Sequence, residues 1–218
     1  MRLRGMGLAV VMIPASFGFV SGCKHESNAG PAAVEKPRND ARELIDRLDK
    51  AAFYRYCETP ESAKQAKIAA LEGGPFGKEL TRRTCPMDTE KLANGGTEEF
   101  MGSCKAIFEV HGVKLAKTAQ MIVVGIGYLV QVNDFEYQVY TVEDTYSDHL
   151  WDIAAKGTLT MCNAVLQRAG SDEKMYMLHS GHDAVAVFLT DEQFNILKDS
   201  SLSESEKPKP ADAIIVKP

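Results

Sequence analysis

The sequence predicts an α+β fold: a mostly helical single domain with a small antiparallel β-sheet, stapled by disulfides. Three observations lead to this class. Apolar residues recur at helical spacing in the part of the chain that follows residue 39. Residues 121–142 are rich in β-branched and aromatic side chains. Residues 39–202, roughly 160 in number, form a segment of the size of one ordinary domain and contain four cysteines.

Residues 1–22 have the layout of a secretory signal peptide. Two arginines, Arg2 and Arg4, precede an uncharged apolar stretch from Gly5 to Val20. A membrane-spanning helix needs about 20 apolar residues, and this shorter run is interrupted by Pro14. Export is therefore favoured over spanning.

The end of this segment, Val20-Ser21-Gly22-Cys23, resembles the lipobox of bacterial lipoproteins. The resemblance implies cleavage after Gly22 and attachment of diacylglycerol and a further acyl chain, such as palmitate, to Cys23. Two or more buried chains are enough for stable anchoring. Lys24 stands where the family's inner-membrane retention signal would be aspartate, which favours the periplasmic face of the outer membrane. The alternative is an ordinary signal peptide with an incidental cysteine.

Residues 23–38 are polar, small and proline-bearing, so we expect a flexible tether between the anchor and the domain. Removal of residues 1–22 changes the formal net charge from −5 to −7, because it removes two arginines and no acid. An acidic chain disfavours nucleic acid and anionic lipid head groups as partners.

The first helices of the domain are predicted from periodicity and capping residues. Residues 39–57 carry an apolar stripe, and a second helix is expected from Thr59 as cap, with Pro60 in its first turn, to Gly73. A connection of about three residues would make the two helices an antiparallel hairpin, with Cys57 at its corner. The stripe consists of Ala41, Leu44, Ile45, Leu48 and Ala52.

The middle of the chain combines weak helical signals with a strong strand signal. A short helix is possible over residues 88–93, and another is expected to begin at Thr97. Residues 121–142 are expected to form a hairpin with its turn at Asn133-Asp134; a buried helix through Leu129 is the alternative.

The last third is predicted to alternate between helix and strand. We expect a short helix over residues 149–156 with Trp151 turned inward, and beyond Gly157 a segment that is helix or strand, with helix favoured. Strands should run to about His179 and over residues 184–189, before a helix that opens with a capping box. The charged, proline-rich tail, residues 203–218, is expected to be disordered or loosely docked.

Four cysteines remain once Cys23 is assigned to lipid: Cys57, Cys85, Cys104 and Cys162. An even number in an exported chain predicts two disulfides. Of the three possible pairings, loop length favours Cys57 with Cys85 and Cys104 with Cys162, since shorter loops cost less entropy to close. The spacings do not fit a zinc site.

No complete catalytic motif is present. The sequence lacks the GxSxG, HExxH and Walker signatures, and the neighbours of Cys162 do not match those of cell-wall cysteine peptidases. No catalytic residue, metal or cofactor is predicted. The densest polar cluster is a possible binding loop at a hairpin tip, formed by His179, Ser180, Gly181, His182 and Asp183.

This loop allows three interpretations: a solvated turn, a histidine base oriented by Asp183, or a metal site if His111 or His149 supplies a third ligand. Its Ser180-Gly181 pair resembles the loop that periplasmic lysozyme inhibitors insert into their enzyme, which suggests a mode of action but transfers no residue role.

The function favoured by the sequence is non-catalytic binding of another envelope or secreted protein by an outer-membrane-anchored lipoprotein. Its most concrete form is an immunity protein or an inhibitor of an envelope-targeting hydrolase. One alternative is a periplasmic hydrolase or metal-dependent enzyme that uses His179, His182 and Asp183. Another is a passive structural lipoprotein of the envelope.

Overall fold

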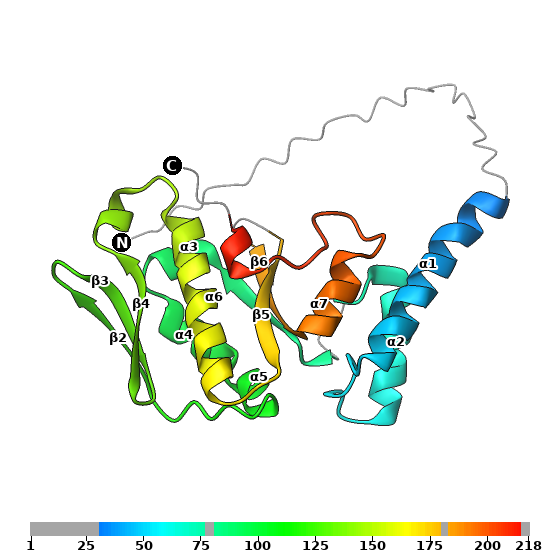
Figure 1. Ribbon diagram of the computed structural model, residues 1–218, viewed down its shortest axis with the longest axis horizontal. Helices are drawn as coiled ribbons and strands as arrows, with labels where there is room; N and C mark the ends of the chain where they lie inside the picture. Colours follow the sequence, from blue (N-terminus) through cyan, green and yellow to red (C-terminus); the bar gives the residue numbers. More distant parts are fainter. Residues whose placement is uncertain (1–30, 77–80, 180–182, 215–218) are drawn as a thin grey trace, which may run out of the picture.

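A computed structural model describes residues 31–76, 81–179 and 183–214 of the chain, with side chains from residue 39 onward except that of Asp183. Its described elements are helices gathered around two antiparallel three-stranded sheets (Figure 1). The predicted α+β class and antiparallel pairing are confirmed. The sequence predicted one small sheet, and the structure has two.

The first sheet, sheet A, lies at the centre of the molecule. It consists of β1 (Thr84–Asp88), β6 (Asp183–Thr190) and β5 (Glu173–Leu178), in that order. Because side chains alternate across a strand, its two faces enter two separate hydrophobic cores. One face packs on α1 (Pro31–Lys50), α2 (Pro60–Gly73) and α7 (Asp191–Lys198). The sequence patterns did not indicate β1.

The opposite face of sheet A belongs to the larger core, which continues to the second sheet. This core contains residues from α3 (Thr89–Ala93), α4 (Thr97–Ser103), α5 (Lys105–Val110) and α6 (Leu150–Arg168). Helix α6 lies between the two sheets in the view of Figure 1 and contacts both β5 and β4. The helix α6 therefore holds the two sheets together.

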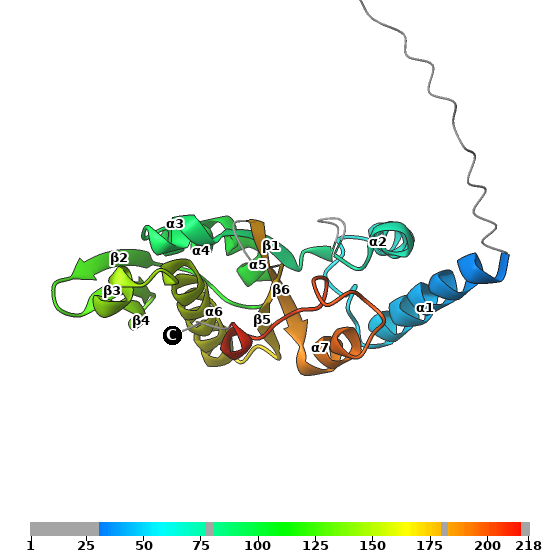
Figure 2. The same cartoon turned by 90° about the horizontal axis from the view of Figure 1, so that it is seen from above.

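Sheet B is a meander of β2 (Thr118–Val123), β3 (Gly127–Val132) and β4 (Phe135–Thr141). The expected hairpin with its turn at Asn133-Asp134 is confirmed as β3–β4; Asn133 adopts a φ of 54° there. The alternative of a buried helix is wrong. A second hairpin, β2–β3, extends from the end of the molecule opposite α1 and α2 (Figure 2).

The helix α6 runs without a break through Gly157, where the sequence suggested an end. A Cβ atom at this position would lie 1.9 Å from the carbonyl oxygen of Val139, so glycine allows α6 to approach β4 closely. Trp151, expected in the core, is 41% exposed at the start of the helix. The expected helix end at Gly157 and the expected burial of Trp151 were both wrong, because tertiary packing determines the length of α6 and the exposure of its first turn.

The helices α1 and α2 pack against each other as predicted, but their connection is longer than expected. The helix α1 ends at Lys50, and residues 51–59 form an irregular loop in which Ala52 adopts a φ of 56°. The cap at Thr59 is confirmed, and the positive φ lies at Gly74, one residue beyond the predicted end. The capping box of Thr190 and Gln193 at α7 is also present.

Both segments expected to be flexible contain structure. The helix α1 begins at Pro31, inside the predicted tether of residues 23–38. In the tail, Lys209 pairs with Met177 through two backbone hydrogen bonds of 2.8 Å, and Ile214 is buried in the larger core. Of the two expected states of the tail, disordered or loosely docked, the structure has the docked one as far as residue 214. The tail docks because it satisfies the outer edge of β5.

The cysteines pair differently from the expectation. Cys85 is bonded to Cys104, whereas Cys57 and Cys162 are free thiols. The predicted pairings of Cys57 with Cys85 and of Cys104 with Cys162 are both wrong. The reason is the position of sheet A: Cys85 faces the larger core, and Cys57 packs against the smaller core on the opposite face.

Among the described residues, no helix combines the length and the apolar character of a membrane span.

Candidate functional site

The predicted binding loop lies largely outside the described residues. Residues 180–182 are not described, His179 is exposed with a φ of 54°, and Asp183 opens β6. Neither proposed third ligand is shown with them: His111 is buried against Glu173, and His149 precedes α6. No group of three or more potential metal ligands is assembled anywhere in the described part of the chain.

The most unusual interior feature is a buried charge cluster that the sequence patterns did not reveal. Arg83 and Glu173 have fully buried side chains, and their Nη1 and Oε1 atoms lie 2.9 Å apart. Arg83 also donates from Nε to the Phe53 carbonyl (2.5 Å) and from Nη1 to the Phe188 carbonyl (2.8 Å). These bonds attach the loop after α1 to sheet A. They satisfy a charge that would otherwise be costly to bury.

Two further residues contact Glu173. Arg55, which is partly exposed, places Nη2 2.7 Å from Glu173 Oε1. His111 Nδ1 lies 2.6 Å from Glu173 Oε2, an ion-pair distance without hydrogen-bond alignment, and the His111 ring stacks on Phe188. Burial opposes ionisation of Glu173, but His111 and Arg83 outweigh it and hold the pKa of the carboxyl below its usual value. Because the side chains of Arg83, Glu173 and His111 are fully buried, no substrate reaches them. The cluster holds the fold together.

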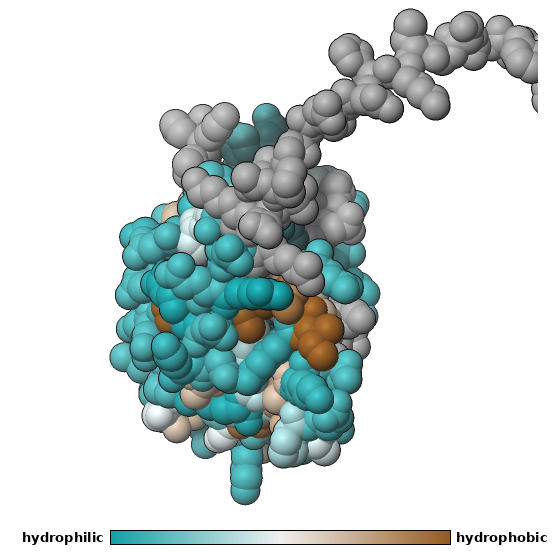
Figure 3. Space-filling model, turned by 90° about the vertical axis from the view of Figure 1, so that its right-hand side faces the viewer, coloured by the Kyte–Doolittle hydropathy of each residue, from teal (hydrophilic) through white to brown (hydrophobic). Residues whose placement is uncertain are grey.

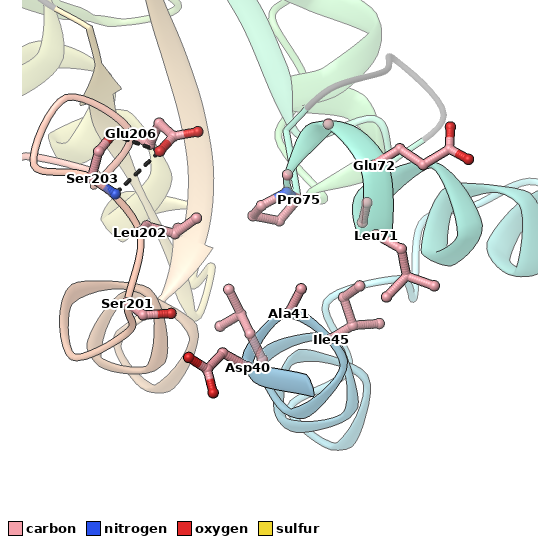
Figure 4. A pocket seen from close by; sticks show the side chains of 14 residues that line it. Asp40, Ala41, Ile45, Leu71, Glu72, Pro75, Ser201, Leu202, Ser203 and Glu206 are labelled. Carbon is pink, nitrogen blue, oxygen red and sulfur yellow. Dashed lines mark hydrogen bonds between the residues drawn. The ribbon is translucent and has the colours of Figure 1, made fainter. Parts of the chain in front are cut away.

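A groove of about 610 Å³ lies between α1, the end of α2 and the loop 201–206. Figure 4 shows Ala41 and Ile45 facing Leu202 across an opening with carboxylates at its margin. Figure 3 looks onto this end of the molecule and shows hydrophobic residues gathered within a hydrophilic surround. Its acidic lining residues are Asp40, Glu72 and Glu206. In addition to the predicted loop, this groove is a candidate binding surface.

Another depression, of about 640 Å³, lies between α6, β5, α7 and the tail. Three of its polar side chains bond to one another. Lys174 Nζ is 2.7 Å from Asp191 Oδ1, and the hydroxyl of Tyr176 donates to the same carboxylate oxygen. Tyr176 also stacks on Phe194 at 4.4 Å. We interpret these contacts as packing that secures α7 to the sheet.

The strongest candidate site is the tip of the β2–β3 hairpin, which we define by Met121, Ile122, Val124 and Ile126. Val124 is 97% exposed and Ile122 is 81% exposed; Ile126 and Met121 are 48% and 39% exposed. Single exposed apolar residues are ordinary, but a contiguous apolar cluster is typical of an interaction site. No other segment of the described chain gathers four exposed large hydrophobic residues.

The local backbone explains why the tip projects. The amide of Ile126 donates to the carbonyl of Val123 at 3.0 Å, and Gly125 has a φ of 77° at the third position of this tight turn. Gly127 allows the strands to close, since a Cβ there would lie 2.2 Å from the Tyr140 carbonyl. The turn places Val124 at its apex, where a polar residue would serve the fold equally well.

The edge strands of the two sheets differ in how far they are protected against pairing with another strand. In sheet A, the amide of Asn163 binds both backbone groups of Met175, Lys209 pairs with Met177, and the other edge strand carries Pro86. In sheet B, β2 pairs only with β3 among the described strands, and its sequence TAQMIV contains no charge and no proline. Proteins usually protect such edges, so an unprotected apolar edge favours a partner.

The sequence contained one signal for this site. The run from Met121 to Ile126 is apolar on both faces of a strand, whereas a surface hairpin normally alternates. A continuous apolar run is equally typical of a fully buried strand, so the pattern alone did not separate the two cases.

Comparisons of the chain with protein-family models, with curated proteins and with solved structures found no match.

Proposed function

We propose that this protein is an envelope lipoprotein that binds another protein without catalysis, and that the hairpin tip is its contact surface. The single observation that carries the binding role is the exposure of Ile122 and Val124 at the end of an unprotected edge strand. Burial of an aliphatic side chain contributes about 1.5–3 kcal/mol, so a partner that covers the tip gains substantial free energy. An immunity protein or an inhibitor of an envelope hydrolase is the most concrete form of this role.

The location rests on the sequence. The lipobox-like residues Val20-Ser21-Gly22-Cys23 support a lipid anchor, and the acidic charge of the chain is consistent with a protein partner. The hairpin tip lies at the far end of the molecule from the start of α1 (Figure 1). A chain anchored at Cys23 would hold its contact surface away from the point of attachment.

The binding role is tested by site-specific photo-cross-linking in cells that carry the gene. A photoreactive amino acid at position 124 of the full chain should cross-link to a second protein. The same amino acid at position 68 should not, because Ile68 is 45% exposed on α2 and is not part of the tip. Absence of any cross-link specific to position 124 would contradict the proposal.

Affinity for the protein identified in this way provides the quantitative test. The double variant Ile122→Ser, Val124→Ser should weaken binding at least tenfold, because two aliphatic contacts are lost, whereas Ile68→Ser should leave it unchanged. Isothermal titration calorimetry measures both. Equal affinities for the tip variant and the wild type would rule out the hairpin tip as the contact surface.

The anchor is tested separately. Labelled palmitate should be incorporated into the wild-type chain and not into Cys23→Ser, which should appear in the soluble envelope fraction. Equal labelling of the two chains would contradict lipidation of Cys23.

A further inference from the structure

The segment of the chain that contains the apolar tip carries charges of one sign. From Thr118 to Ala155 the chain contains six carboxylates and neither a lysine nor an arginine. Four of these carboxylates lie in the segment that follows β4. Asp144 accepts hydrogen bonds from Thr141; the other three, Glu143, Asp148 and Asp152, we call the acidic rim. Glu143 and Asp148 are exposed, and none of the three forms an ion pair with a described residue.

The fold brings this rim to the same end of the molecule as the tip. Thr141, the last residue of β4, pairs with Gly127 at the base of the turn, and the short helix Glu143–Tyr146 follows directly. That helix contacts both β4 and α6. Figures 1 and 2 agree in placing it, with the start of α6, beside the β2–β3 hairpin.

Two exposed aromatic residues lie in the same segment of the chain as the rim. Tyr146 is 85% exposed and Trp151 is 41% exposed. Tyrosine and tryptophan combine a large apolar ring with a polar group and are enriched where protein interfaces have their strongest contacts. This end of the molecule therefore combines the apolar tip, two exposed aromatic side chains and the acidic rim.

The charge distinguishes between possible occupants. A second copy of this chain would bring an identical acidic rim against the first, and like charges in an interface oppose association. An anionic lipid surface would repel the rim for the same reason, because such surfaces attract basic segments. A cationic protein is attracted, and its approach is accelerated by the same field.

We propose that the partner of the hairpin tip is a cationic protein that offers an apolar groove or an unpaired strand edge bordered by lysine or arginine. This inference rests on the proposed function, since it names the chemistry of the partner that the tip binds. The tip supplies the contact area. The acidic rim supplies selection and orientation of the partner, because charges at a rim act mainly on the rate of association and on specificity.

The experiment uses the full chain with the photoreactive amino acid at position 124, in the cell, and compares two charge-reversed backgrounds. Glu143→Lys with Asp148→Lys reverses the exposed part of the rim. The matched control, Glu43→Lys with Asp46→Lys, reverses two exposed carboxylates on α1 at the opposite end of the molecule. The yield of the position-124 adduct is measured for each, and the attached chain is identified by mass spectrometry.

We expect the rim reversal to lower the yield at least tenfold, the control reversal to leave it within about twofold, and the attached peptide to come from a basic surface. Four results would overturn the inference: an unchanged yield after rim reversal, an equal loss in the control, an adduct with a second copy of this chain, or an adduct with lipid. If position 124 gives no adduct in any background, the proposed function itself has failed. If the yield of the position-124 adduct is unchanged by rim reversal, the proposed binding role stands and only the inference of a cationic partner is overturned.

Discussion

Two regions of this molecule invert the usual distribution of polar and apolar groups. Around Arg83, charged side chains are fully buried, and at the hairpin tip, Ile122 and Val124 are largely exposed. The buried charges are compensated within the chain, because Glu173 and backbone carbonyls satisfy the guanidinium. The exposed apolar groups have no such compensation among the described residues. The first region therefore stabilises the fold, and the second favours a contact outside it.

The largest effect should come from breaking the buried cluster. We expect Arg83→Ala to lower the free energy of unfolding by about 3–5 kcal/mol, because it removes one of the two guanidinium partners of the buried Glu173 carboxylate and the bonds that Arg83 donates to the Phe53 and Phe188 carbonyls. The neighbouring residue provides the control: Arg82 is exposed and, within the described part of the chain, pairs with Glu58, so Arg82→Ala should cost at most about 1 kcal/mol. Urea unfolding followed by circular dichroism measures both. Similar losses for the two variants would show that Arg83 is not a buried ion-pair partner.

The pH dependence of stability should test the contribution of Glu173 to the same buried cluster. The folded pKa of Glu173 lies below its unfolded value of about 4.3, so the stability it contributes is present above that pH and is lost as the pH falls through the folded pKa. We expect Glu173→Gln to be less stable than the wild type by about 1.5–3 kcal/mol at pH 7, and the difference to shrink below about pH 4.

Urea unfolding at pH 7 and pH 3 measures this difference. Glu99, whose exposed carboxylate pairs with Lys91, is the control, and Glu99→Gln should differ from the wild type by at most about 1 kcal/mol at either pH. A difference for Glu173→Gln that stays constant between the two pH values would show that its ionisation does not contribute.

A smaller effect is expected where α6 supports the sheet that bears the tip. Alanine at position 157 would place its Cβ against the Val139 carbonyl, so Gly157→Ala should destabilise the protein by about 1–3 kcal/mol. Helix propensity alone predicts the opposite sign. At Gly102 in α4, an added Cβ would have no atom within 4 Å, and Gly102→Ala should stabilise by about 0.5–1 kcal/mol. Stabilisation by both substitutions would contradict the close approach of α6 to β4.

The smallest effect on folding should come from the tip. Ile122→Ser with Val124→Ser removes exposed groups that the fold does not use, so the free energy of unfolding should stay within about 0.5 kcal/mol of the wild type. Thermal unfolding of the isolated protein measures this. A clear loss of stability would mean that the tip packs against the chain itself, and the contrast with the buried cluster would disappear.

Features that depend on neighbours in the chain were determined by the sequence alone. The cap at Thr59, the capping box at Thr190 and the turn at Asn133 appear where local residue chemistry indicated them. The α+β class followed from the same local patterns of periodicity. These signals are readable because each is complete within a few residues.

The candidate site could be predicted only in part. The sequence indicated a β-hairpin over residues 121–142 but drew attention to residues 179–183, because polar side chains resemble a site more than aliphatic ones do. The apolar run was visible, whereas its exposure depends on which elements pack around sheet B. Burial of Arg83 depends in the same way on partners 30, 90 and 105 residues distant.

The tertiary structure decided which residues from distant segments meet. It paired Cys85 with Cys104 because both lie in the larger core, on the same side of sheet A. It also set α6 against β4 at Gly157. It also enclosed Arg83 while leaving Val124 at an open apex. The physical reason is the same in each case: hydrophobic burial acts on the whole chain and is not directional, so the sequence states which groups favour burial and the packing determines which of them achieve it.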